Sequence, residues 1–216
     1  MSSNDWFRKS TWAKEDEDDF FAHLEKIDNP FHKAQYVRIQ ALHLQDVGNP
    51  LMLYSAIKLV ELMIERWPEP SQLAMAYLQK AECLEALGYT KEAIEAFRNS
   101  LAAERAFPKM RTSASLSFGM FAVSHELSDL YSEVLSVLDE FPDAVNSPER
   151  EFQNSVIRSF IAAYQGDADK ARNYALEAIN ANQKTYSGRR FDSSTLGLIE
   201  KPDSDMHKKL CDIAGL

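Results

Sequence analysis

The side chains that could bind a metal ion or attack a substrate are few and widely spaced. The five histidines and two cysteines are His23, His32, His43, His125, His207, Cys83 and Cys211. A helical zinc site needs two histidines four residues apart, and cysteine sites usually contain a CxxC pair. The sequence has neither pattern. We therefore expect no metal site and no cofactor.

Patterns typical of nucleophilic or nucleotide-dependent enzymes are also missing. The sequence lacks GxSxG, a Walker loop and GxGxxG. Cys83 falls in the middle of an expected helix, where a small packed residue is a better interpretation than a nucleophile. Acid pairs such as Glu82 and Glu85 are common on solvated helix faces. The sequence does not exclude a catalytic pair that the fold assembles from distant positions. We nevertheless expect a protein that is not an enzyme.

Composition and charge exclude several classes of protein. The 216 residues include 33 acidic and 24 basic side chains, which gives a net charge of −9. Nucleic acid and anionic membranes attract positive surfaces, so neither is an expected partner. The hydrophobic fraction of 45% is typical of a globular domain. The two distant cysteines, the lack of a signal-peptide pattern and the lack of a long apolar run predict a cytoplasmic protein.

Helix start and stop signals divide most of the chain into short segments. Asn29, Asn49 and Ser147 each precede a proline, the arrangement of an N-cap followed by the first helical residue. Thr90 and Asp167 are further cap candidates. Apolar residues recur at helical spacing between these signals, and no segment alternates as a strand does. We expect helices over 14–27, 31–47, 50–67, 71–87, 90–106, 109–125, 128–140, 148–165, 168–182 and 203–214.

Three kinds of landmark recur with nearly the same period. The glycines Gly48, Gly88 and Gly166 stand where helices should end, and their intervals are 88 − 48 = 40 and 166 − 88 = 78, twice 39. Small residues in the helix before each turn keep the same period, at Ala41, Ala81, Gly119 and Ser159. Prolines follow the second helices at Pro68, Pro108 and Pro142. Such a period predicts stacked helix pairs, because one pair cannot bury its apolar face alone.

These landmarks resemble the tetratricopeptide repeat. The second repeat fits that pattern best, with Tyr77, Ala81, Leu84, Gly88, Ala93 and Phe97. The fourth fits in the run from Gly166 to Ala178, whereas the third has Glu126 near the position of the turn glycine. The resemblance covers residues 31–183. It implies an all-α, TPR-like α-solenoid of about four antiparallel helix pairs with capping segments at both ends.

The two ends of the chain fall outside the repeats. We expect residues 1–30 to form an N-terminal aromatic and acidic cap, 31–183 the repeat array, and 184–216 a tail with a short capping helix. The N-terminal aromatics are alternatively a binding patch. The acidic block 15–19 is expected to begin a helix, where negative charge is favourable, and alternatively docks a basic partner.

The usual function of stacked helix pairs is binding along a concave groove that the first helix of each pair lines. Alignment on the small residues places ten residues there: Gln35, Arg38, Leu42, Gln45, Met75, Leu78, Gln79, Glu82, Leu116 and Met120. We expect a non-enzymatic scaffold or adaptor that binds a peptide or protein segment. A neutralising inhibitor of a basic partner, and a regulator or enzyme with a small-ligand pocket, are the alternatives. The sequence does not decide whether the chain forms a homodimer.

Overall fold

The computed structural model describes residues 6–141, 147–183 and 204–216. Helices make up 79% of these residues, and none of them forms a strand. The predicted all-α fold is therefore confirmed. No helix in the described part of the chain combines the length and hydropathy that a membrane span requires.

The chain divides into two compact units, Met1–Ala114 and Ser115–Leu216, each of which is described by itself. The first unit contains α1 (Lys14–Glu25), α2 (Pro30–Val47), α3 (Pro50–Arg66), α4 (Pro70–Ala86) and α5 (Thr90–Ala106). The second begins with α6 (Ala114–Ser124), the 3₁₀ helix η1 (Ser128–Leu130) and α7 (Tyr131–Glu140). It continues with α8 (Pro148–Tyr164), α9 (Ala168–Asn182) and α10 (Ser204–Ala214).

Most helix starts follow the capping signals of the sequence. The Asn29 side chain accepts a hydrogen bond from the backbone N–H of Phe31, and Asn49 accepts one from Met52. Ser147 and Asp167 cap α8 and α9 in the same way. Each bond satisfies an N–H that has no partner inside the helix. Thr90 differs from the prediction, because it is the first residue of α5 rather than its cap.

The largest error in the predicted elements is the start of α6. We expect a helix over 109–125, but α6 begins at Ala114. The buried carboxylate of Glu104 accepts hydrogen bonds from both the backbone N–H and the hydroxyl of Thr112. Thr112 in turn accepts a hydrogen bond from the backbone N–H of Ala114. These side-chain bonds hold 108–113 outside the helix, since they replace the backbone bonds that a helix would supply.

The sequence landmarks coincide with repeated local structure. The small residues Ala41, Ala81, Gly119 and Ser159 are all buried. Seven residues after each one, the backbone adopts a left-handed conformation, with φ of 73° at Gly48, 79° at Gly88, 53° at Glu126 and 78° at Gly166. These turn residues are 40, 38 and 40 positions apart (88 − 48, 126 − 88 and 166 − 126). The period thus marks both the closely packed residue and the turn of each helix pair.

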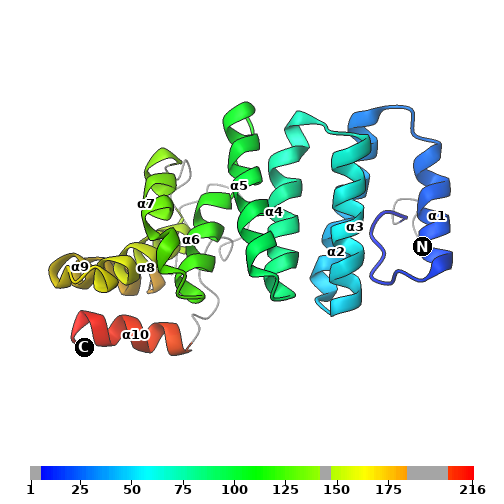
Figure 1. Ribbon diagram of the computed structural model, residues 1–216. Helices are drawn as coiled ribbons and strands as arrows, with labels where there is room; N and C mark the ends of the chain where they lie inside the picture. Colours follow the sequence, from blue (N-terminus) through cyan, green and yellow to red (C-terminus); the bar gives the residue numbers. More distant parts are fainter. Residues whose placement is uncertain (1–5, 142–146, 184–203) are drawn as a thin grey trace. The chain divides into compact units, whose positions relative to one another are not determined.

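In the first unit, neighbouring helices pack on one another in chain order, α2 on α3, α3 on α4 and α4 on α5 (Figure 1). The connections between them hold only two or three residues, which makes consecutive helices antiparallel. Helix α4 also contacts α2. The two helices are parallel, because α3 reverses the chain between them.

In the second unit, α10 covers the apolar face of α8 and α9. Leu210 and Ala214 of α10 are fully buried in a cluster with Phe152 and Val156 of α8. Ala175, Ala178, Ile179 and Ala181 of α9 complete this cluster. The short C-terminal helix expected over 203–214 is thus present. Residues 1–5 and 184–203, part of the expected cap and most of the expected tail, lie outside the described residues.

Candidate functional site

Eight of the ten predicted groove residues lie on α2 and α4 of the first unit. The other two, Leu116 and Met120, lie on α6 in the second unit. Leu116 is buried, and Met120 packs against the cluster beneath α10. A mainly polar line of side chains runs where α2 and α4 meet. We call it the α2–α4 seam and define it as Gln35, Arg38, Leu42, Gln45, Gln72, Met75, Gln79 and Glu82.

Side-chain hydrogen bonds join the two helices along the seam. Arg38 Nε donates to Gln72 Oε1 at 2.8 Å, and Gln45 Nε2 donates to Glu82 Oε2 at 2.8 Å. Between them, Gln79 Nε2 donates to the backbone oxygen of Arg38 at 3.3 Å. Residue numbers rise together on both helices, from 38 and 72 to 45 and 82. This pairing agrees with the parallel arrangement of α2 and α4.

The two charged groups of the seam are half-buried, and each is bonded to a neutral amide. Burial lowers the pKa of the Arg38 guanidinium below its usual value. Burial is also the main cause that raises the pKa of the Glu82 carboxyl; the charge of Glu85 adds to it, and the hydrogen bond from Gln45 opposes it. Neither Arg38 nor Glu82 forms an ion pair with another described residue. Each charge has lost water without gaining a counter-ion among the residues that the structure describes.

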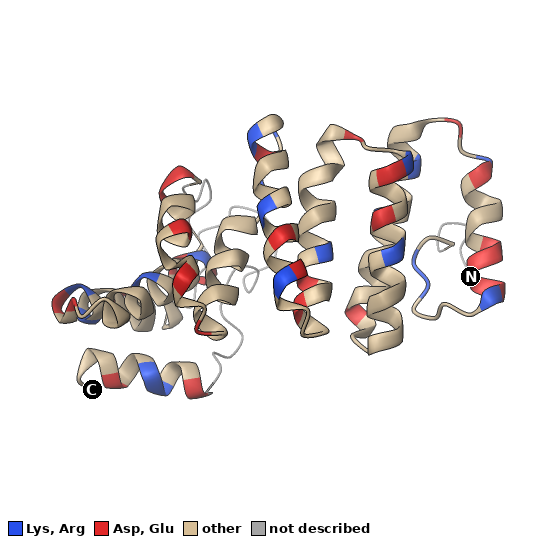
Figure 2. Cartoon of the chain, in the orientation of Figure 1, with Lys and Arg blue, Asp and Glu red and all other residues tan. Residues whose placement is uncertain are grey.

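The seam has opposite charges at its two ends. Arg38 precedes Gln45 by seven residues on α2, which is about 10 Å at 1.5 Å per residue. The charged residues of α4, Lys80, Glu82 and Glu85, all fall in its C-terminal half (Figure 2). The N-terminal half of α4, which contains Gln72, has no charged residue. A segment lying along the seam would therefore meet a cation first and an anion about two helical turns later.

The remaining predicted residues differ in their access to solvent. Leu42 is 38% exposed, and Gln35 and Met75 are half-buried, so these three provide apolar and amide surface beside the charges. Leu78 is only 3% exposed and packs in the core, where it presents no surface to a partner. Gln79 is equally buried. The accessible part of the seam is thus Gln35, Arg38, Leu42, Gln45, Met75 and Glu82.

Two amide oxygens of the seam accept no hydrogen bond within the described residues. They are Gln45 Oε1 and Gln79 Oε1, both of which are buried. A buried acceptor without a donor costs about 1–3 kcal/mol, so native proteins contain few of them. Both atoms are covered by the chain, so they present no acceptor to a partner on the surface.

Sequence reasoning missed two glutamines. Gln72 holds the Arg38 guanidinium and is itself buried. Gln40 is fully buried; its Oε1 accepts from the backbone N–H of Lys9 at 2.9 Å and its Nε2 donates to the Lys9 oxygen at 2.7 Å. Both fall on the apolar side of amphipathic helices. A polar residue at an apolar position was the signal that could have identified them.

The N-terminal aromatics pack onto α1 and α2. The Trp6 ring stacks on His23 at 5.3 Å between centroids and contacts Tyr36 at 5.1 Å. It also contacts Phe20, which Trp12 contacts from its other side. Phe7 and Phe20 are buried. These rings therefore cover the N-terminal end of the first unit.

The acidic block 15–19 is bonded within the chain. Lys9 Nζ lies 2.9 Å from Asp19 and 3.5 Å from Asp16, and Lys14 Nζ lies 2.8 Å from Asp18. The Lys9–Asp19 hydrogen bond is the main cause that raises the pKa of Lys9 and lowers the pKa of Asp19. Four of its five acids thus pair with the chain's own lysines, and the two that pair with Lys9 help to hold the N-terminal segment on α1.

The described cysteines and histidines suggest no catalytic centre. Cys83 is 1% exposed, and burial together with the charge of Glu82 raises its thiol pKa to about 12. It remains protonated at neutral pH and is a poor nucleophile. Cys211 Sγ lies 3.7 Å from His207 Nε2, one turn away on α10. This His–Cys pair has the four-residue spacing of a helical metal site but is not a pair of histidines. No group of three metal-binding side chains occurs among the described residues.

Comparison with protein-family models, with curated proteins and with solved structures finds no match to this chain. The function must therefore be argued from the site itself.

Proposed function

We propose that this chain is a non-enzymatic protein–protein interaction module, a TPR-like array of about four helix pairs that binds a peptide segment of a partner along the α2–α4 seam. The repeated landmarks support the array. A buried small residue is followed seven positions later by a left-handed turn residue in four successive helix pairs. That recurrence is typical of helical repeat proteins, which use the first helices of their pairs for binding.

The observation that carries the proposal is the pair of half-buried charges on the seam. Within the described part of the chain, Arg38 and Glu82 are held by amides rather than by counter-ions. Charges that are already desolvated gain more from a counter-ion than solvated charges do, because the cost of removing their water was met on folding. A partner that supplies a carboxylate to Arg38 and an ammonium or guanidinium to Glu82 would gain that interaction.

The spacing of these charges restricts the partner sequence. About 10 Å separates the two ends of the seam, and an extended chain advances about 3.3 Å per residue. Three residues therefore span the distance. We propose an acidic residue and a basic residue three positions apart in the bound segment, with an apolar side chain between them against Leu42 and Met75.

Affinity capture with the full chain as bait, followed by mass spectrometry, would identify the partner. Its affinity is then measured for wild type and for R38Q and E82Q, two variants that remove a charge and keep a hydrogen-bonding group. We expect each variant to weaken binding about tenfold, because charged hydrogen bonds are worth about 1.5–3 kcal/mol. K58Q, at an exposed position on α3, is the matched control. If R38Q and E82Q bind as wild type does while their circular dichroism is unchanged, the seam is not the binding site.

A further inference from the structure

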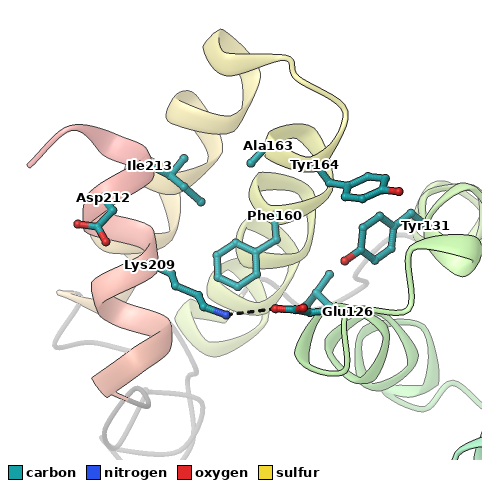
Figure 3. Close-up of a pocket in the computed structure, with 9 residues that line it drawn as sticks. Glu126, Tyr131, Phe160, Ala163, Tyr164, Lys209, Asp212 and Ile213 are labelled. Carbon is teal, nitrogen blue, oxygen red and sulfur yellow. Dashed lines mark ion pairs between the residues drawn. The ribbon is translucent and has the colours of Figure 1, made fainter.

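The second unit contains a pocket that is separate from the α2–α4 seam. It has a volume of about 530 Å³ and lies among α6, α7, α8 and α10 (Figure 3). Its lining residues are Val123, Glu126, Tyr131, Phe160, Ala163, Tyr164, Lys209, Asp212 and Ile213. Small-molecule sites in proteins commonly hold about 300–1,000 Å³ and are mostly apolar with a few polar groups. This pocket has both properties.

Aromatic rings form much of the pocket wall. Tyr131 and Tyr164 meet edge to face, with 5.2 Å between their centroids and an interplanar angle of 89°. Tyr131 is buried, Tyr164 is 66% exposed, and Phe160 lies between them and α10 (Figure 3). A cation within about 6 Å of such a ring face is attracted by the π electrons of the ring. The wall can therefore bind the apolar body of a ligand and also a positive group.

Charged residues line one side of the pocket. The Lys209 ammonium and the Glu126 carboxylate lie beside Phe160, whereas the Asp212 carboxylate lies on the side of α10 that is turned away from Phe160 (Figure 3). Lys209 Nζ lies 3.7 Å from Glu126 Oε1, beside the Phe160 ring (Figure 3). Both side chains are largely exposed, at 63% and 80%. Ion pairs of this kind contribute about 0–1 kcal/mol, so a ligand can displace the lysine at little cost.

We propose that this pocket binds a small organic amine with an apolar or aromatic body, whose ammonium takes the place of Lys209 beside Glu126. The body of the ligand lies against Tyr131, Phe160 and Tyr164. The Glu126 carboxylate disfavours an anion at this position. The volume exceeds what a single alkyl ammonium group needs, which favours a ligand with a body of its own. The proposal does not depend on the seam, which belongs to the other unit.

The test uses the full chain and three probes of similar shape: benzylamine, benzyl alcohol and benzoate. Binding is followed by titration with NMR detection. We expect benzylamine to bind about fivefold more tightly than benzyl alcohol, the size of an exposed cation–π and ion-pair contribution, and benzoate to bind most weakly. Equal binding of the amine and the alcohol, or no binding of benzylamine at 10 mM, would overturn the proposal.

Variants locate the binding in the pocket. E126Q and Y164A should each reduce benzylamine binding about threefold or more, and both change exposed side chains, so the fold is preserved. K209A should increase it, because the competing ammonium is gone. K208A, which changes the neighbouring exposed lysine outside the pocket, is the matched control and should have no effect. If K209A and K208A behave alike and E126Q binds as wild type does, the amine does not bind here.

A lysine side chain of a protein partner carries the same ammonium group. Nα-acetyl-lysinamide distinguishes this source from a free amine, since it has the ammonium without an aromatic body. We expect it to bind more weakly than benzylamine. Binding as tight as that of benzylamine would assign the pocket to peptide lysines and overturn the proposal of a free organic amine.

Discussion

Gly119 lies directly against Ile157. A Cβ atom placed on Gly119 would be 2.6 Å from Ile157 Cδ1 and 3.2 Å from both Cγ1 and Cγ2. The Cγ2 methyl is attached to the branched Cβ, so a rotation that moves Cδ1 away does not clear the whole contact. A side chain larger than hydrogen at this position therefore requires Ile157 of α8 to move.

The variant G119A should therefore lower the free energy of unfolding. Overpacking a closely packed core costs about 1–3 kcal/mol, although alanine is the better helix former. Urea denaturation of wild type and variant measures the difference. The I157A change should cost less stability in the G119A background than in wild type, because the shortened Ile157 side chain makes room for the new methyl. A G119A protein as stable as wild type would contradict the close approach.

The small-residue period shows how far the sequence determines this fold. Small residues, turn glycines and prolines recur because packing and backbone geometry require them at each helix pair, so helix number, order and most boundaries could be predicted. Features that depend on contacts between distant residues could not. The Glu104–Thr112 hydrogen bonds that delay α6, and the division of the chain after Ala114, have no local signal in the sequence.

The candidate site was only partly predictable for the same reason. Helical spacing placed Arg38, Gln45 and Glu82 on one side of α2 and α4. Spacing alone could not show that Gln72 holds Arg38 or that Leu78 faces the core. Those outcomes depend on how deeply each side chain is inserted between neighbouring helices. The pocket against α10 depends on the return of the C-terminus to α8 and α9, which periodicity does not reveal.

Glu126 occupies a turn that glycine occupies in the other helix pairs. Its φ of 53° is left-handed, which costs a non-glycine residue about 1–2 kcal/mol. The variant E126G should raise the free energy of unfolding by up to about 1 kcal/mol, since the greater freedom of glycine in the unfolded chain offsets part of the gain. Thermal and urea unfolding measure this change.

The converse variant, G88A, is the control for this argument. Gly88 has a φ of 79°, so alanine there should lower the free energy of unfolding by about 1 kcal/mol. The E126G change also removes the ion pair with Lys209. This pair is exposed and weak, so its loss should have little effect on stability. K209A alone should leave stability nearly unchanged. An E126G protein less stable than wild type would contradict the prediction.

Lys9 should make the N-terminal segment sensitive to acid. Its hydrogen bond is the main cause that lowers the pKa of Asp19. The pKa of Asp16 is lowered mainly by a hydrogen bond from Thr11, to which Lys9 adds, so both folded carboxylates lose their charge at lower pH than in the unfolded chain. The resulting stabilisation is complete above the unfolded pKa of about 3.9 and disappears as pH falls through the folded values. Wild type should unfold at a higher temperature than K9A at pH 6, and the difference should become smaller as pH falls below about 3.9.

The exposed Lys26 provides the control for Lys9. K26A should behave as wild type does throughout this pH range. Added salt should also reduce the difference between wild type and K9A, because the pairs are partly exposed to solvent. A difference that is the same at pH 3 and pH 6 would mean that Lys9 acts through packing of its stem rather than through its charge.

Glu82 should show the opposite pH dependence. Burial raises the pKa of its carboxyl in the folded chain, so the folded state holds the proton more tightly than the unfolded state does. Stability is then greatest below the unfolded pKa of about 4.3 and decreases as pH rises through the folded value. E82Q keeps an oxygen that can accept from Gln45 but cannot ionise. It should equal wild type near pH 4 and exceed its stability at pH 7.

The comparison is made by urea denaturation across this pH range, with E95Q, at an exposed position on α5, as the control. The same E82Q variant is expected to bind the partner more weakly. Greater stability together with weaker binding is the behaviour of a charge that is kept for recognition at a cost to folding. If E82Q is less stable than wild type at pH 7, the carboxylate stabilises the fold, and the argument that it awaits a counter-ion from a partner is wrong.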